Sequence, residues 1–393
     1  MNSEWQIKPM PEVVKWGSGG TPKATEASYY ENGTIPWLII GDLNDGIVSK
    51  AATRITELGL QNSSAKLIPS GTLLIAMYGS IGKLGITGIE CCTNQAIAFA
   101  KELYGVTTKY MFYYLSFIKP KLIAKGKGGT QKNISQTVLN SLDVPVPPLE
   151  EQARIVARIE ELFSQLESGV ETLKQTQEQL AVYRQAVLKE AFAHIEKKAS
   201  IRDLTTLVTS GSRGWAQYYS DRGALFIRIG NLTRTGIEIN FDDIQNVSLP
   251  DRAEGLRSRL QPNDVLISIT ADLGSIGLVP ETIPEAYINQ HIAVVRFQNS
   301  NQGKFMAYYL RSDWGQKDLL KNKRGAGKMG LGLDDIRDTP VPVVSDDEAA
   351  EVLAEIESRL SVCDQIEQTV DAALQQAEAL RQSILKKAFE GGL

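Results

Sequence analysis

Residues 183–192 read YRQAVLKEAF, and residues 380–389 repeat them with few changes as LRQSILKKAF. Upstream of this pair, further matches occur in the same order and at nearly the same separation. They are IGDL and IGNL, starting at residues 40 and 229, GSIG at 79 and 274, NQ at 94 and 289, and YYL at 113 and 308. Several ordered matches with little drift in separation indicate a duplicated unit rather than chance similarity.

Each unit ends in a predicted long helix, at about residues 151–193 and 348–389, without an internal proline. Apolar residues recur there at heptad spacing, the pattern of a coiled-coil seam. The residues expected on the seam are Ile159, Leu166, Leu173, Leu180, Val187, Ile356, Val370, Leu380 and Ile384. A helix of about 40 residues spans roughly 60 Å, which is too long for one small core. We therefore expect the two helices to pair as an antiparallel coiled coil.

The segments before these helices, residues 1–148 and 199–341, are predicted to be similar globular domains of mixed α/β class. They contain short runs of β-branched and aromatic residues between Gly, Asn and Pro, which is typical of strands. A proline cluster at the end of each segment marks a boundary, because proline disfavours helical geometry in the residue before it. The sequence thus predicts two further segments, the helical regions 149–198 and 342–393.

The net charge of −4 is unevenly distributed. Residues 1–148 carry 14 basic and 10 acidic side chains, whereas residues 342–393 carry 4 basic and 11 acidic ones. The acidic excess lies on the predicted helices, so the charge of the whole chain does not exclude a local basic surface. No apolar run is long enough to cross a membrane, and the polar start argues against a signal peptide. Three cysteines without CxxC spacing favour buried thiols in a reducing cytoplasm.

Each globular segment carries a basic, glycine-rich stretch at the matching position. Lysines neutralise DNA phosphates, glycines let backbone N–H groups approach them, and Gln, Asn and Arg side chains can reach base edges. A solvated loop is the alternative, but two matched copies favour DNA contact. The candidate DNA-binding residues are Lys121, Lys125, Lys127, Thr130, Gln131, Lys132, Asn133, Arg213, Lys321, Lys323, Arg324 and Lys328.

Other motifs do not indicate catalysis or metal binding. The two histidines, His194 and His291, have no evident Cys or carboxylate partner, and no GxxxxGK[ST] nucleotide loop occurs. We therefore expect no catalytic residue and no metal site in this chain. The repeated Asn-Gln pairs at 94–95 and 289–290 could read bases, although their apolar flanks fit buried framework amides at least as well.

These features resemble the specificity subunits of type I restriction–modification systems over nearly the whole chain. The resemblance rests on GGTP at 19–22, IPWLIIGDLNDG at 35–46, VPVPPLEEQARIVARIEELF at 144–163 and the two helix ends. It implies two target recognition domains, each reading one half of a split, asymmetric DNA sequence. It also implies that the helices form an antiparallel coiled coil and dock two modification (methyltransferase) subunits, to which restriction subunits can be added.

The resemblance implies that the chain is not itself an enzyme. S-adenosylmethionine, ATP and Mg²⁺ would belong to the partner subunits, and no NPPY or DPPY methyltransferase motif occurs here. The second unit departs from the pattern, with GSRG at 211–214 in place of GGTP and PVVSDDE at 342–348 in place of PPLEEQ. A coiled-coil scaffold whose heads bind proteins is the alternative function. A solitary methyltransferase or nuclease is a third, which activity of the purified chain alone would support.

Overall fold

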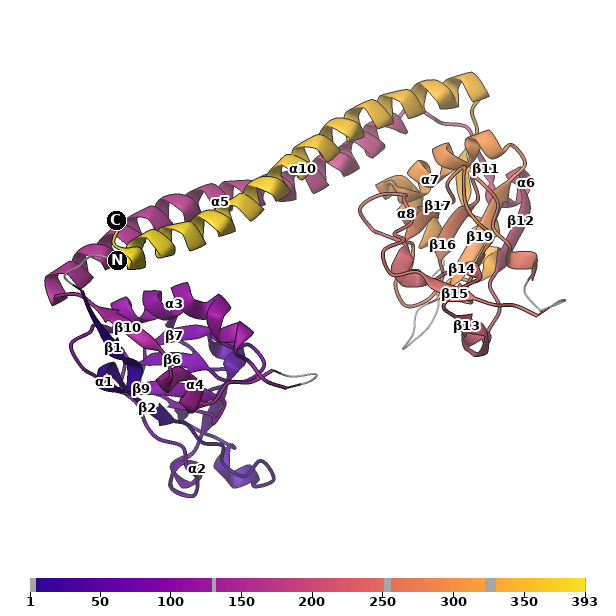
Figure 1. The fold of residues 1–393 in the computed structure, drawn as a ribbon. Helices are drawn as coiled ribbons and strands as arrows, with labels where there is room; N and C mark the ends of the chain where they lie inside the picture. The colour runs from indigo at the N-terminus through magenta and orange to yellow at the C-terminus, as the bar shows by residue number, and fades with distance from the viewer. Residues whose placement is uncertain (1–4, 129–131, 251–255, 322–329, 393) are drawn as a thin grey trace. The chain divides into compact units, whose positions relative to one another are not determined.

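A computed structural model describes residues 5–128, 132–250, 256–321 and 330–392 of the chain (Figure 1). Its contacts divide the chain into two compact units. The first unit comprises Met1–Thr172 and Ala373–Leu393, and the second unit comprises Leu173–Ala372. Both divisions fall inside long helices, so the division into four consecutive segments made from the sequence stays a prediction.

The first unit contains a five-stranded sheet, a three-stranded sheet and a two-stranded ribbon. Across the large sheet the strands are β2 (Val14–Ser18), β9 (Ile97–Leu103), β6 (Leu73–Ala76), β7 (Leu84–Thr87) and β4 (Gly46–Val48). The small sheet has the order β5 (Thr53–Ile55), β3 (Ile35–Leu38) and β8 (Cys92–Thr93), and the ribbon pairs β1 (Gln6–Pro9) with β10 (Asp143–Val146). The short helices are α1 (Met10–Val13), α2 (Glu57–Gln61), α3 (Thr108–Ala124) and α4 (Gln136–Asn140).

The second unit is built from two four-stranded sheets and a ribbon. The first sheet has the order β12 (Thr205–Ser210), β19 (Ile292–Phe297), β16 (Val265–Ser268) and β17 (Ile276–Leu278). The second sheet has the order β13 (Tyr219–Ser220), β15 (Gln245–Val247), β14 (Ala224–Ile227) and β18 (Ala286–Ile288), and the ribbon pairs β11 (Lys198–Ser200) with β20 (Pro340–Pro342). The short helices are α6 (Ile201–Leu204), α7 (Gly303–Arg311), α8 (Asp313–Leu319) and α9 (Leu333–Arg337).

The two units share one topology, which confirms the duplication inferred from the sequence. The order β2-β9-β6-β7 corresponds to β12-β19-β16-β17, and the parallel pair β3–β8 corresponds to the parallel pair β14–β18. The repeated IGDL and IGNL motifs have the same structural role. Asp42 and Asn231 each accept a hydrogen bond at 2.8 Å from the backbone N–H three residues before them. The repeated motifs therefore encode the framework of the fold.

In each unit, helices pack the sheet against the ends of two long helices. The central strands β6 and β16 are buried along their whole length. In the first unit, α3 contributes Tyr110 and Leu115 to the same core as Ile159 and Phe389 of the long helices. The second unit replaces the single α3 by α7 and α8, because Ser312 leaves the helical conformation and caps α8 through the Gly315 N–H.

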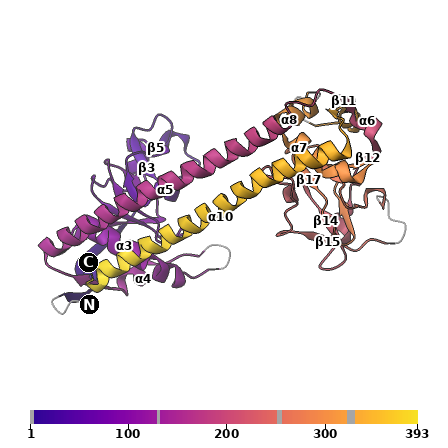
Figure 2. The same cartoon turned by 90° about the horizontal axis from the view of Figure 1, so that it is seen from above.

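The long helices are α5 (Leu149–Ala191) and α10 (Asp346–Glu390), whose ends lie within two residues of the predicted ones. In the second unit, polar contacts join α5 to α10. With the α5 residue first, the pairs are Gln177–Asp371, Arg184–Asp364 and Glu190–Arg359. Residue numbers rise along α5 while they fall along α10, so these stretches run antiparallel. Figure 2 shows these stretches of α5 and α10 side by side within the second unit.

Most of the predicted seam residues are shielded from solvent. Ile159, Leu180, Val187, Ile356, Val370 and Ile384 are at most 8% exposed, and Leu166 and Leu173 are half-buried. The placement of Leu380 on the seam is wrong, because this side chain is 50% exposed. The second shielded line on this part of α10 passes one residue later, through Leu374, Arg381 and Ala388. There the Arg381 guanidinium lies 4.5 Å from the centroid of the Phe163 ring and covers it.

The three cysteines, Cys91, Cys92 and Cys363, are buried and unpaired in the described part of the chain. Burial raises the pKa of Cys91 to about 12 and that of Cys92 to about 11, so both thiols stay protonated at neutral pH. They serve as small apolar core residues. Among the described residues, no helix has the length and apolar character required to cross a membrane.

Candidate nucleic-acid interface

The basic stretch of the first unit begins in α3 and continues beyond its end. Lys121 lies in the last turn of α3, and Lys121, Lys125, Lys127 and Lys132 are all exposed. Lys127 and Asn133 exchange two backbone hydrogen bonds, at 2.9 and 2.8 Å, so the backbone at these two positions of the stretch is paired. Thr130 and Gln131, also predicted to bind DNA, lie outside the described residues.

Backbone hydrogen bonds anchor this stretch beside the end of β6. Ile134 N–H donates to the Met77 carbonyl at 2.9 Å, and Gly79 N–H donates to the Lys132 carbonyl at 3.1 Å. The backbone of Asn133 bridges to that of Tyr78, whose side chain is 46% exposed. Exposed cationic, amide and phenol side chains therefore lie together where the central strand β6 of the large sheet ends. We call this end of the strands the sheet edge.

The second unit anchors the matching segment in the same way. Leu331 N–H donates to the Ile269 carbonyl at 3.0 Å, and Gly330 bridges to Thr270. Of the predicted DNA-binding residues, Lys321 is exposed two residues after the end of α8, and Arg213 is exposed after β12. The remaining ones, Lys323, Arg324 and Lys328, lie outside the described residues.

The repeated Asn-Gln pairs divide into a framework residue and an accessible one. The side-chain oxygens of Asn94 and Asn289 each accept a hydrogen bond at 3.1 Å from the backbone N–H two residues later. These asparagines therefore shape the turn before β9 and β19. Their neighbours differ, since Gln95 is exposed and Gln290 is partly exposed.

One glycine in each unit lets the chain pass close to this turn. A Cβ on Gly19 would lie 2.2 Å from the Thr93 carbonyl oxygen, and a Cβ on Gly211 would lie 2.1 Å from the Ile288 carbonyl oxygen. Both obstacles are backbone atoms, which cannot rotate away. The GGTP and GSRG motifs are therefore structural equivalents, although only their first glycine is the same.

Sequence reasoning missed Tyr78, Thr270 and His291 as members of these edges. The His291 ring nitrogens lie 2.5 Å from Thr270 Oγ1 and 3.0 Å from Gln290 Nε2. Thr270 and Tyr78 hold the same position, because each follows the residue whose carbonyl anchors the segment described above. The available signal was the repeated NQ motif, which marks the turn that His291 follows.

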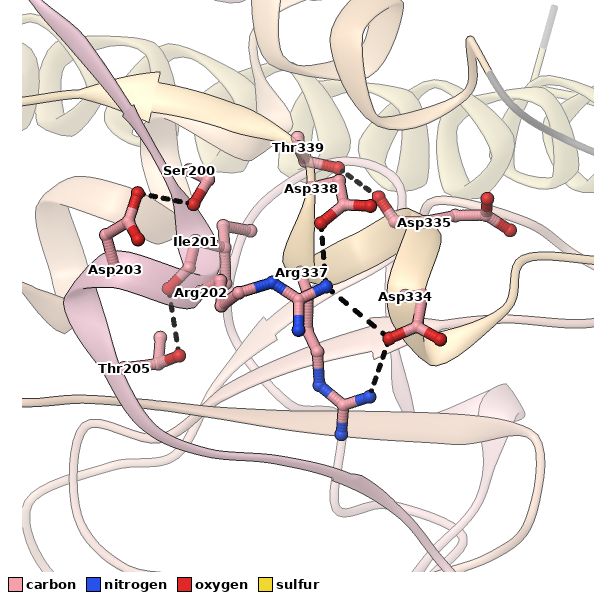
Figure 3. A network of polar contacts seen from close by, with 10 residues as sticks. All are labelled: Ser200, Ile201, Arg202, Asp203, Thr205, Asp334, Asp335, Arg337, Asp338 and Thr339. Carbon is pink, nitrogen blue, oxygen red and sulfur yellow. Dashed lines mark hydrogen bonds and ion pairs between the residues drawn. The ribbon is translucent and has the colours of Figure 1, made fainter.

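A polar network connects α6 and its neighbouring residues with α9 and the segment before β20 in the second unit (Figure 3). Ile201 N–H donates to the Thr339 carbonyl at 3.0 Å and so joins α6 to the segment before β20. The ion pairs around this bond are Arg202–Asp338 at 2.8 Å, Arg202–Asp334 at 3.5 Å and Arg337–Asp334 at 3.0 Å. Hydrogen bonding from Arg337 holds the pKa of Asp334 below its ordinary value. The network therefore joins α6 to α9 and to the segment before β20, and its opposite charges are paired with one another.

The class of fold is a duplicated α/β unit combined with long helices. One α/β unit occurs twice, and each copy packs on long helices and presents exposed polar side chains at the same sheet edge. Within the described ranges, no three His, Cys, Asp or Glu side chains gather in a way that could hold a metal ion.

Residues 2–178 and 237–376 match the family described as the type I restriction modification DNA specificity domain. The chain belongs to this family, which confirms the resemblance seen in the sequence. Its relatives are named as specificity subunits, the non-catalytic subunits of type I restriction enzymes.

The chain is 25% identical to the type I restriction enzyme EcoBI specificity subunit of Escherichia coli over 429 residues, which cover 100% of this chain and 87% of that relative. It is 24% identical to the StySPI specificity subunit of Salmonella potsdam over 420 residues, covering 99% and 89%. Its fold is similar to a chain from a study of complex assembly and conformational transition of the type I R-M system. The TM-score is 0.76 at 18% identity, and the match covers 100% of this chain and 99% of the other.

Proposed function

We propose that this chain is the DNA sequence-recognition subunit of a type I restriction–modification complex and reads a bipartite, asymmetric site. Each unit binds one half of that site. The observation that carries the proposal is the duplicated edge: both units anchor the corresponding segment by the same backbone bond, at 2.9 and 3.0 Å, yet present different side chains there. A conserved framework with divergent exposed residues suits two related but unequal half-sites.

We further propose that α5 and α10 form an antiparallel coiled coil that sets the distance between the half-sites. Contacts between the two helices within each unit support this, and those of the second unit run antiparallel. Arg184 bonds to Asp364 at 2.6 Å and to Glu367 at 2.7 Å in the second unit, and Arg381 bonds to Glu167 at 2.7 Å in the first.

The same helices are the proposed docking surface for two modification subunits, which in turn accept restriction subunits. The proposed surface includes large apolar side chains that lie exposed along these helices and would be buried by a partner. They are Leu149, Val182, Val362, Ile366 and Leu380, each at least 39% exposed. S-adenosylmethionine, ATP and Mg²⁺ are then bound by the partner subunits and not by this chain. The proposed compartment is the cytoplasm, where unpaired buried thiols remain reduced.

Replacing both Lys125 and Lys127 by alanine should weaken DNA binding and make it less dependent on salt. Each phosphate contact contributes about one unit to the slope of log affinity against log salt, so the double variant should lose about two units of slope. The measurement is titration of fluorescent DNA with the complex of this chain and its modification subunit at several salt concentrations.

A matched control is the double replacement of Lys50 and Lys66, which are exposed on the same unit but lie outside the basic stretch. Both double variants remove two positive charges, so a long-range charge effect would lower their slopes equally. Unchanged affinity and slope in the Lys125 and Lys127 variant would contradict the assignment of this stretch to DNA.

A further inference from the structure

Exposed or partly exposed side chains around the repeated Asn-Gln turn form one corner in each unit. The first corner comprises Thr21, Tyr78, Gln95 and Ala96, and the second corner comprises Arg213, Thr270, Gln290 and His291. In each case, three chain segments that are far apart in the sequence contribute one or two residues. The basic stretch of the first unit adjoins its corner, since Asn133 bridges to Tyr78.

The backbone of the two corners is the same. Two hydrogen bonds in each unit bring the contributing segments together. The first bond runs from Gly19 N–H to the Ile97 carbonyl, and its counterpart runs from Gly211 N–H to the Ile292 carbonyl, both at 3.4 Å. The second bond runs from Met77 N–H to the Ala96 carbonyl at 2.8 Å, and its counterpart runs from Ile269 N–H to the His291 carbonyl at 2.9 Å. Positions 21, 78, 95 and 96 therefore correspond one by one to positions 213, 270, 290 and 291.

The side chains at these positions differ, with one exception. Thr21, Tyr78 and Ala96 of the first corner are replaced by Arg, Thr and His in the second, whereas the glutamine is present in both. The glutamines are oriented differently by their neighbours. Gln95 accepts a hydrogen bond from the Thr21 hydroxyl, whereas Gln290 Nε2 donates to Nε2 of His291 at 3.0 Å. The two corners thus present the same amide in two different polar settings.

We infer that the corners are the base-reading sites, one for each half-site, with Gln95 and Gln290 contacting base edges in the major groove. This inference rests on the proposed DNA-recognition function. A glutamine amide offers a donor and an acceptor side by side, which matches N7 and N6 of adenine, and Arg213 offers the paired donors that match guanine. The flanking residues make the two half-sites different, while neighbouring lysines such as Lys132 hold the phosphates and set the register.

The test compares Gln95→Ala and Gln290→Ala in the complex of the full chain with its modification subunit. The probes are duplexes in which each base pair of the recognised site is replaced in turn, and the readout is the Kd ratio at each position. Gln95→Ala should lower discrimination roughly tenfold or more at one or two positions in one half-site, and Gln290→Ala should do the same in the other half-site.

Gln61→Ala is the matched control, because it removes an exposed amide of the first unit that lies in α2 and outside the corner. It should leave every ratio unchanged. The inference is overturned if both corner variants keep unaltered discrimination, or if both lose it in the same half-site. In either case, specific binding by the wild-type complex still upholds the proposed function. Absence of discrimination by the wild-type complex overturns the proposed function itself.

Discussion

Replacing Phe389 by alanine is expected to destabilise the first unit by about 3–5 kcal/mol, the range for deleting a fully buried aromatic ring. Phe389 is 2% exposed and lies near the end of α10. Its ring centroid lies 5.4 Å from those of Tyr110 and Tyr114 and 5.6 Å from that of Phe117, all three in α3. The substitution removes all three of these ring contacts between α10 and α3, and the cavity left behind adds to the loss.

Hydrogen exchange of the α3 amides measures this effect locally, because it reports the free energy of opening of that element. Leu380→Ala is the control, since it truncates another apolar side chain of α10 that is 50% exposed. Its effect should stay within about 0.5 kcal/mol. A loss of less than about 1 kcal/mol in Phe389→Ala would mean that the end of α10 does not contribute to the core of the first unit.

Replacing Gly211 by alanine is expected to destabilise the second unit by about 3 kcal/mol, at the upper end of the range for overpacking. The added Cβ would lie 2.1 Å from the Ile288 carbonyl oxygen and 2.4 Å from the Asn289 carbonyl oxygen. The chain must then move away from β18 and the Asn-Gln turn, which displaces Arg213. DNA discrimination should therefore fall in one half-site even where the variant remains folded.

Gly230→Ala provides the comparison within the same unit. A Cβ at Gly230 meets no heavy atom within 4 Å, so the substitution should change stability by no more than about 0.5 kcal/mol. Urea denaturation followed by circular dichroism gives both values. Equal midpoints for the two variants would show that the close approach at Gly211 does not constrain the fold.

The helices and the duplication could be predicted because both depend on local sequence. Heptad spacing without proline gave the ends of α5 and α10 to within two residues. The error at Leu380 has a physical cause: the shielded line includes Arg381, whose guanidinium covers Phe163, and a charged residue does not count as apolar in a periodicity. A pattern of apolar residues therefore does not reveal positions where the methylene stem of an arginine or lysine is buried.

The site was only partly predictable for a different reason. The lysines stand out because they cluster along the chain, whereas Tyr78, Gln95 and Thr21 are brought together by strand register. Register depends on pairing between segments that are distant in sequence, such as Met77 with Ala96. The repeated asparagines Asn94 and Asn289 drew attention for function, yet their side chains bond to the backbone and shape the turn.

The central claim is tested most directly by base-resolution mapping of DNA methylation in cells that express this chain with its modification subunit, compared with cells that express that subunit alone. The account predicts one new asymmetric motif with two short specified parts and a fixed unspecified gap. Exchange of residues 199–341 for the corresponding segment of a relative should then change one part only. No new methylation, with the modification subunit demonstrably bound to this chain, would contradict the account and favour a protein-binding scaffold.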